Sequence, residues 1–446
     1  MLPANSQNAL DRSQVQEFLD YYLDTVMGES SPNALARGVE RFIAHGKLEQ
    51  ITDELAKIIE NNGTIFTFGN GGSDAFAQHL AFSLRISLNN RKIRIFENPS
   101  LCYCQHISQS QDYDLALSEF LKQNGITGSG LVLFSASGNS NNVIKAAKTA
   151  KKLGIKTFSF TGFKGGKLKP LTDFSVNSQI LDQQPAEDSN QIILHLMVLL
   201  LKLKFQKKKS LFKKEKARYL GSVSKSLEKI DSEFIAQLSK SIVKRYLENR
   251  KVFVYAPEGG AISITSDHIA HNLQWDAILN VANPPTIQLN SSLLSTQYSG
   301  ISNDRRGHFA HGLQIRVSAN PGDLLLLFAS EPNSKSVKHT ILEALEKGLE
   351  VFLITSSKQK NRFKKVKELN LGATKGFVFS DVAQIIGHIL GRLVRLELMI
   401  SLNQSPHNIA RYLIENDLAQ LMIKKEANIE LKAEYRRLEK KWIQRE

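Results

Sequence analysis

Two loops rich in glycine and serine carry the residue types that hold a phosphate group. The stretch 69–73 (GNGGS) follows an apolar run at 64–68, and the stretch 135–140 (SASGNS) follows another at 131–134. Glycines let backbone N–H groups approach an anion closely, and a helix that starts after the loop adds partial positive charge. One such loop could be an ordinary strand-to-helix turn, but two favour a phosphate site. The predicted phosphate ligands are Asn70, Gly71, Ser73, Ser135, Ser137 and Ser140.

The elements that must position these loops follow from an alternation of short apolar runs with longer helical segments. This alternation is typical of a parallel sheet covered by helices on both faces, which is an α/β fold. Both loops then lie at the carboxyl ends of strands, where open parallel sheets bind their ligands. We expect strands at 64–68, 93–96, 131–134, 157–160 and 174–176, a helical lead-in at 13–60 and a closing helix at 188–204.

The second half of the chain repeats landmarks of the first half in the same order and at a nearly constant offset. Three pairs carry this observation: QIILH from 191 and QIIGH from 384, QHLAFSL from 78 and DHIAHNL from 267, LVLFSASGNS from 131 and LLLLFASEPNS from 324. Ordered matches of this kind predict two copies of one fold. We place the boundary in the lysine-rich stretch 206–221. The expected domains are 1–210, and 221–446 with a C-terminal helical extension.

The first half resembles a known family in its motifs. GNGGS, a Gln-His pair five residues later, SGNS-x-NV, and FTG followed by Lys-Gly-Gly are similar to the sugar isomerase (SIS) domain, and specifically to phosphoheptose isomerase. The resemblance covers nearly all of residues 35–205 and persists in weaker form over 225–400. It implies two tandem SIS-type domains, each a doubly wound parallel sheet of the three-layer, Rossmann- or flavodoxin-like class.

The resemblance also assigns roles to single residues. His79 falls where metal-dependent members place a zinc-binding histidine, and His195 matches the second active-site histidine. Glu187 falls where many members have a glutamine ligand. The resemblance therefore implies that these three are catalytic and could together hold a divalent metal such as Zn²⁺. The alternative, that both histidines are packed helix residues with satisfied hydrogen bonds, stays open.

Two departures bear on whether the chain is an enzyme. Ser83 stands where the family has the glutamate that acts as base, and Ser110 stands near the place of a second carboxylate. A serine hydroxyl is a poor base near pH 7, so Glu187 is the group that could compensate. One interpretation is an aldose–ketose isomerase acting on sedoheptulose 7-phosphate or a related sugar phosphate. The other is a non-catalytic sensor or scaffold that binds a sugar phosphate.

The second copy has diverged in both loops. Residues 258–261 (EGGA) have lost the serine, and Glu331 and Pro332 stand where Ser137 and Gly138 stand in the first copy, so we expect a carboxylate there to repel phosphate. Asn303-Asp304 survives, and His268 and His388 match the two histidines of the first copy. Either the second copy supplies groups to the first, or it is kept as a structural dimerisation partner, which we favour.

Composition limits the remaining classes. The net charge of +15 is concentrated in lysine runs at 202–216 and from 424, which are typical of solvated helix faces, and no nucleic-acid-binding motif accompanies them. Cys102 and Cys104 are too few for a structural zinc site or a disulfide framework. With no apolar stretch behind a basic start, we expect a cytoplasmic protein without a membrane partner. We expect it to form a homo-oligomer, or to pair its two SIS domains within one chain.

Overall fold

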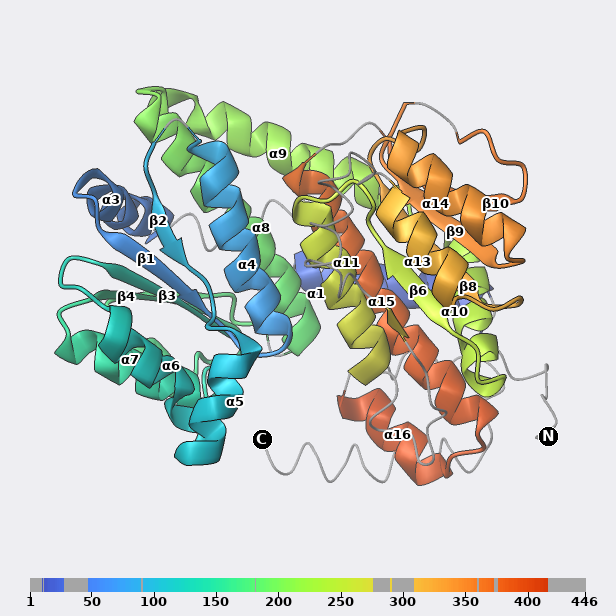
Figure 1. Ribbon diagram of the computed structural model, residues 1–446, viewed down its shortest axis with the longest axis horizontal. Coiled ribbons are helices and arrows are strands. Elements are labelled where there is room, and N and C mark those ends of the chain that lie inside the picture. Colours follow the sequence, from blue (N-terminus) through green and yellow to red (C-terminus); the bar gives the residue numbers. More distant parts are fainter. Residues whose placement is uncertain are drawn as a thin grey trace. The chain divides into compact units, whose positions relative to one another are not determined.

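The computed structural model describes residues 10, 12–27, 47–89, 91–180, 182–275, 289–290, 309–358, 361–372 and 376–415. Its backbone divides into two compact units (Figure 1). The first unit comprises Asp24–Lys225. The second unit comprises Met1–Leu23 and Ser226–Glu446.

The first unit is a five-stranded sheet in which every neighbouring pair of strands is parallel, in the order β2-β1-β3-β4-β5. Figure 1 shows α6 and α7 against one face and α4 and α8 against the other. Its elements are α3 (Lys47–Glu60), β1 (Thr64–Phe68), α4 (Gly72–Ser87), β2 (Arg94–Phe96), α5 (Leu101–Ser110), α6 (Ala116–Asn124), β3 (Gly130–Ser135), α7 (Asn141–Lys152), β4 (Lys156–Thr161), β5 (Phe174–Asn177), α8 (Gln183–Phe205) and α9 (Phe212–Leu227), whose last residues belong to the second unit.

Apolar side chains on both faces of the central strands hold this sheet between its helices. All residues of β1 and β3 are buried, as expected for a parallel sheet covered on both sides. Phe134 stacks on Phe160 with ring centroids 4.9 Å apart, and Phe66 and Phe68 meet edge to face. Burying a phenylalanine contributes about 2–3 kcal/mol, so these rings fix the strands from which the loops emerge.

The α/β class predicted from the sequence is confirmed, and the five strands of the first unit lie within two residues of their predicted positions. The closing helix begins at Gln183 rather than at 188. Pro185 lies in its first turn, where the missing N–H costs no intrahelical hydrogen bond. The earlier start places Glu187 inside the helix. The predicted lead-in at 13–60 corresponds to α1 (Arg12–Met27) and α3, and residues 28–46 lie outside the described residues.

The second unit has a sheet of the same topology, in the order β10-β9-β8-β6-β7. In each sheet the first strand of the unit lies between its second and third strands, and the fourth and fifth strands follow the third. The shared order supports the expected duplication. Its elements are α1, α10 (Ser232–Leu247), β6 (Val252–Tyr255), α11 (Ala261–Trp275), β7 (Leu289–Asn290), α13 (Ala310–Ser318), β8 (Leu324–Ala329), α14 (Lys335–Glu346), β9 (Glu350–Thr355), β10 (Val366–Asn370), α15 (Phe377–Ser401) and α16 (Pro406–Glu415).

The N-terminal helix α1 belongs to the second unit, whereas the sequence-based domain limits of 1–210 and 221–446 place it in the first. Its ring of Tyr22 lies 5.2 Å from the guanidinium carbon of Arg392, a cation–π contact with α15. The domain limits 1–210 and 221–446 remain a prediction from the sequence. Asn303-Asp304 and the basic segment from Lys424 lie outside the described residues.

Among the described helices, α15 is long and apolar enough to cross a bilayer by length and composition. The most apolar stretch of this helix is 94% buried within the protein. Such burial is that of a core helix, because a membrane-spanning helix needs an apolar surface for lipid.

Candidate functional site

The two glycine- and serine-rich loops meet at one edge of the first sheet. Strands β1 and β3 are neighbours, and Phe68 pairs with Leu133 just before the two loops begin. The amides of Asn70 and Asn142 then join the loops reciprocally, with N–O distances of 2.7 and 2.8 Å. The two loops that carry the predicted phosphate ligands therefore lie next to each other.

The serine loop is held in a tight turn by its own hydroxyls. Ser135 is buried, and its Oγ accepts a hydrogen bond from the Gly138 N–H at 3.2 Å and lies 3.3 Å from Ser140 Oγ. Ser137 is exposed, and its Oγ accepts from the Asn139 N–H at 3.2 Å. Ser73 lies in the first turn of α4 and is 7% exposed. The hydroxyls thus shape the loop as well as offering donors.

A third loop supports this turn through glycines at which a side chain would clash with the backbone. Gly138 has φ of +67°, and a Cβ there would lie 2.1 Å from the Gly165 carbonyl oxygen. A Cβ on Gly166 would lie 2.5 Å from the Ser137 carbonyl oxygen. Leu168 N–H also donates to the Gly138 carbonyl at 3.0 Å. The Lys-Gly-Gly stretch seen in the sequence therefore packs against the backbone of the serine loop.

Two backbone amides of the serine loop are left for a ligand. Within the described part of the first unit, no protein acceptor lies within hydrogen-bonding distance of the Ala136 and Ser137 N–H groups. They follow the end of β3 and precede α7, whose first turn adds partial positive charge. An oxyanion fits this arrangement.

The second unit contains the same pair of amides with an acceptor in place. Ser135 pairs with Thr161 at the end of β3, and Ala329 pairs with Thr355 at the end of β8, so residues 330 and 331 correspond to 136 and 137. The Glu258 carboxylate accepts from Ser330 N–H at 2.7 Å, Ser330 Oγ at 2.9 Å and Glu331 N–H at 2.9 Å. The protein's own anion occupies this position in the second unit.

This contact changes the explanation for the divergence of the second copy. The sequence predicted that Glu331, in the place of Ser137, repels a phosphate. In the structure the Glu258 carboxylate also lies at the loop amides, where it accepts hydrogen bonds from the Ser330 and Glu331 N–H groups. Glu258 and Asn70 each precede a pair of glycines, but Glu258 is the third residue after β6, whereas Asn70 is the second residue after β1.

The predicted catalytic histidines lie side by side in the first unit. His79 on α4 and His195 on α8 are fully buried, with ring centroids 5.6 Å apart at 77°. Glu187, two turns before His195, is 4% exposed, and its Oε1 accepts from Gln183 Nε2 at 3.1 Å. The ligand atoms of the three residues do not lie within 4.8 Å of one another. The structure thus brings the two imidazoles together but does not complete a three-ligand metal set.

The two departures from the family pattern have different surroundings. Ser83 lies one turn after His79 on α4 and is fully buried, and within the described residues its hydroxyl has no hydrogen-bond partner. Ser110 is exposed at the end of α5, where its hydroxyl donates to the His106 carbonyl at 3.0 Å. Ser83 therefore occupies the expected position beside the histidines, whereas Ser110 bonds only within its own helix.

The second unit repeats the histidine pair. His268 on α11 and His388 on α15 have ring centroids 5.2 Å apart at 87°, and His268 Nδ1 lies 3.3 Å from Gln384 Oε1. Burial, with a smaller effect of His388, lowers the pKa of His268 to about 3, so this ring is neutral at pH 7. The second unit therefore keeps its histidine pair although the Glu258 carboxylate occupies its loop amides. This indicates that the pair has a role in packing as well as in any chemistry.

Asp74 is a carboxylate next to the phosphate loop that the sequence analysis did not single out. It lies in the first turn of α4, where its Oδ2 accepts from Gln78 Nε2 at 3.0 Å. Its Oδ1 is buried and has no partner within the described residues. Burial raises the pKa of Asp74 from 3.8 to about 6, and the nearby charge of Glu97 adds to the increase.

Replacing Asp74 with asparagine is expected to stabilise the protein at pH 8 by about 2 kcal/mol, because the buried negative charge is removed. The folded state holds the Asp74 proton up to a pKa of about 6 and the unfolded state releases it near 3.8, so ionisation of this group lowers stability as pH rises between these values. Urea unfolding at pH 8 and pH 3.5 measures the effect. The gain should vanish at the lower pH, and an equal gain at both would contradict the assignment.

Comparison with known proteins shows which family the first unit resembles. The model of the SIS domain matches residues 33–162. The phosphoheptose isomerase of Helicobacter pylori is 32% identical over 153 residues, which are 34% of this chain and 80% of that protein. The chain belongs to the family of SIS-domain proteins that includes the phosphoheptose isomerases. The Mycobacterium tuberculosis phosphoheptose isomerase is 32% identical over 154 residues, 32% of this chain and 76% of that protein.

A solved structure extends the fold comparison over both units. The C-terminal domain of glucosamine-fructose-6-phosphate aminotransferase from Francisella tularensis aligns with a TM-score of 0.56 and 13% identity. The alignment covers 89% of this SIS-domain chain and 98% of that one. At this identity the likeness concerns the fold alone, and it supports an SIS-type architecture for most of the chain.

Some residues of the site were missed by sequence reasoning. Asn98, after β2, accepts from Gly69 N–H at 3.2 Å and donates to the Gly69 carbonyl at 2.7 Å, which fixes the start of the first loop. Nothing near Asn98 in the sequence signals this contact. Asn142 is different, because it belongs to the SGNS-x-NV motif, and its position in that motif could have marked it as a partner of the first loop.

Proposed function

We propose that the first unit binds a phosphorylated sugar and acts as an aldose–ketose isomerase on sedoheptulose 7-phosphate or a related sugar phosphate. One observation carries the binding proposal. The Ala136 and Ser137 amides lack a protein acceptor, while their counterparts in the second unit hold the Glu258 carboxylate. Loops that bind an internal anion in one copy are suited to an external anion in the other.

A phosphate monoester suits the first unit better than a carboxylate. It carries about 1.5 to 2 negative charges at pH 7 and three acceptor oxygens. Two free amides, the starts of α4 and α7 and the hydroxyls of Ser137 and Ser140 surround the space with donors. Charge-assisted hydrogen bonds of this kind contribute about 1.5–3 kcal/mol each.

The proposed reaction moves a carbonyl group between neighbouring sugar carbons. A base takes the proton from the hydroxyl-bearing carbon beside the carbonyl, and the carbonyl oxygen gains a proton as the enediol forms. A proton then returns to the former carbonyl carbon while the neighbouring hydroxyl gives up its proton and becomes the new carbonyl. His195 is our proposed proton carrier, because an imidazole nitrogen can accept a proton and return it. Glu187 and Asp188 are buried carboxylates on the same helix, and we propose that Glu187 assists in place of the missing base at Ser83.

Zinc remains a proposal that concerns the same three residues. Two imidazoles and one carboxylate are the donor set of many catalytic zinc sites, and such an ion would polarise the substrate carbonyl. His79 and His195 are near enough to share an ion, and Glu187 would have to turn toward them. Calorimetric titration with Zn²⁺ tests this directly, and no heat of binding would remove the proposal.

A sensor or scaffold that binds the sugar phosphate without converting it is the second candidate. The buried Ser83 favours it, since no carboxylate stands one turn after His79. Purified protein should be given a panel of sugar phosphates in a thermal-shift assay, with and without Zn²⁺, and then assayed for aldose formation. Turnover supports the isomerase, and a thermal shift without turnover supports the sensor. A panel that produces no shift contradicts both.

A further inference from the structure

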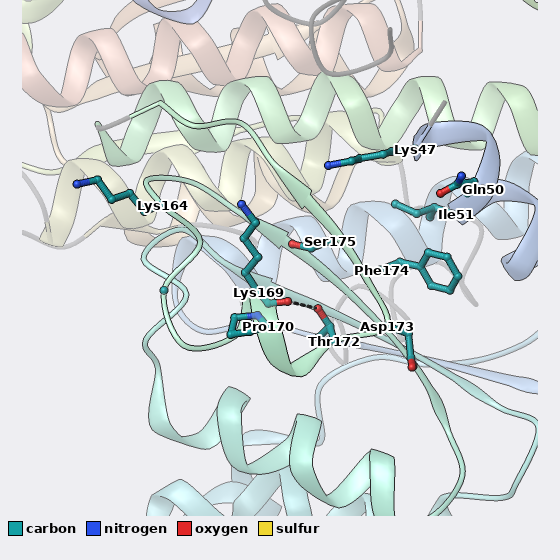
Figure 2. Close-up of a pocket in the computed structure, with 11 residues that line it drawn as sticks. Lys47, Gln50, Ile51, Lys164, Lys169, Pro170, Thr172, Asp173, Phe174 and Ser175 are labelled. Carbon is teal, nitrogen blue, oxygen red and sulfur yellow. Dashed lines mark hydrogen bonds between the residues drawn. The ribbon is translucent and has the colours of Figure 1, made fainter. Parts of the chain in front are cut away.

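A pocket in the first unit lies apart from the two phosphate loops. It encloses about 460 Å³ between the first turn of α3 and the segment 164–175, a size within the range of small-molecule sites. Figure 2 shows Lys47 and Lys169 extending toward the same space, with the Ser175 hydroxyl near them and Lys164 farther along. Three lysines from two separate segments thus line one pocket.

The positive charge of this pocket is not neutralised by the described residues. Its one acidic lining residue is Asp173, whose Oδ2 already accepts from the Thr157 N–H at 2.8 Å and the Thr157 hydroxyl at 2.9 Å. In Figure 2 the Asp173 side chain points away from Lys169. No described carboxylate forms an ion pair with Lys47, Lys164 or Lys169. Lysines that line one pocket without a counter-charge attract an anion.

The pocket also contains a directed donor and an apolar wall. Ser175 Oγ accepts a hydrogen bond from Ser159 Oγ at 3.0 Å, so its own proton remains to be donated. Ile51, Pro170 and Phe174 provide carbon surface, and Phe174 is fixed by stacking on Phe158 with centroids 5.4 Å apart. Such a mixture suits an organic anion of several carbons better than a bare ion.

We propose that this pocket is a second anion-binding site, for a small organic polyanion whose phosphate or carboxylate oxygens are held by Lys47 and Lys169. The site stands on its own lining residues and does not depend on the proposed isomerase activity. It shares a loop with the phosphate site, because the stem of Lys169 packs against Gly165, and Gly165 and Gly166 back the serine loop. A ligand here contacts the structure that supports Gly138.

The test compares two double variants of the full chain that lose equal charge. Lys47→Met with Lys169→Met removes the proposed ligands but keeps the side-chain stems. Lys148→Met with Lys167→Met removes two exposed lysines that do not line the pocket. Calorimetric titration with citrate and with pyrophosphate, at low ionic strength, should give an affinity at least 10-fold weaker in the first variant and within 2-fold of wild type in the second.

Two probes separate carboxylate from phosphate ligands, because the one that binds more tightly indicates the natural class. Citrate should also bind when the first site is saturated with sugar phosphate, since the two sites are separate. Three results would each overturn the proposal. They are equal losses of affinity in the two double variants, no binding of citrate and none of pyrophosphate, and competition between citrate and sugar phosphate. Failure of sugar phosphates to bind would affect the proposed function and leave the comparison of the variants intact.

Discussion

Replacing Asn70 with glutamate is expected to abolish sugar-phosphate binding by the first unit, with a loss of affinity of at least about 100-fold. Asn70 precedes the pair Gly71-Gly72 as Glu258 precedes Gly259-Gly260, and the Glu258 carboxylate accepts hydrogen bonds from the loop amides of the second unit. A glutamate there would reach the Ala136 and Ser137 amides from within and would repel the ligand's charge. Calorimetric titration of the variant with sedoheptulose 7-phosphate measures the loss.

The matched control is Asn70→Gln, which has the length of glutamate without its charge. It also breaks the reciprocal bond with Asn142, so it reports the cost of that bond alone. We expect the glutamine variant to lose no more than about 10-fold in affinity, which is about 1.4 kcal/mol. Equal effects of the two substitutions would show that the charge is unimportant and would contradict the assignment of the amides.

The reverse substitution examines the second unit. Glu258→Asn removes the carboxylate that accepts three hydrogen bonds and leaves the Ser330 and Glu331 amides open. The variant should unfold more readily, and inorganic phosphate should restore more of its melting temperature than it adds to wild type. A variant that loses stability and does not respond to phosphate would mean that Glu258 is only a structural link.

Replacing His195 with alanine is the second large effect that we expect. If His195 carries the proton, turnover should fall about 100- to 10,000-fold, which is the usual contribution of a general acid or base. Affinity for the sugar phosphate should stay within about 3-fold, since the ester is held at the loops and not by this ring. Steady-state kinetics and calorimetry on the same preparation separate the two quantities.

His311→Ala serves as the control for the loss of a buried imidazole. His311 packs against Tyr255 in the second unit with ring centroids 5.0 Å apart, and burial lowers its pKa to about 4. Its truncation should reduce stability and leave turnover per folded molecule unchanged. Equal loss of turnover in both variants, or loss of binding in His195→Ala, would contradict a proton-carrying role.

Much of the fold could be predicted from the sequence because its signals are local. The apolar runs at 64–68 and 131–134 are short, continuous and followed by glycine or serine, as buried parallel strands are. The repeat of QIILH and QIIGH aligned two helices, and their histidines do occupy equivalent places, each beside a second histidine. The order of the strands in each sheet was not predicted and comes from the structure.

The contacts that decide binding were harder to predict, because they join residues far apart in the chain. Glu258 meets Ser330 and Asn70 meets Asn142 only after the sheet has brought two loops together. The sequence identified the missing serine in the second copy but attributed the divergence to Glu331. Likewise, the unusual pKa of Asp74 depends on burial by α4 and its neighbours, which no local pattern encodes.

The most direct test of the central claim, that loop amides of the first unit bind a phosphate ester, is a pair of calorimetric titrations of the wild-type chain. One uses sedoheptulose 7-phosphate and the other uses unphosphorylated sedoheptulose. We predict saturable binding of the phosphate ester, displaced by inorganic phosphate, and no measurable binding of the free sugar. Equal binding of both sugars, or binding that inorganic phosphate leaves unchanged, would contradict the claim.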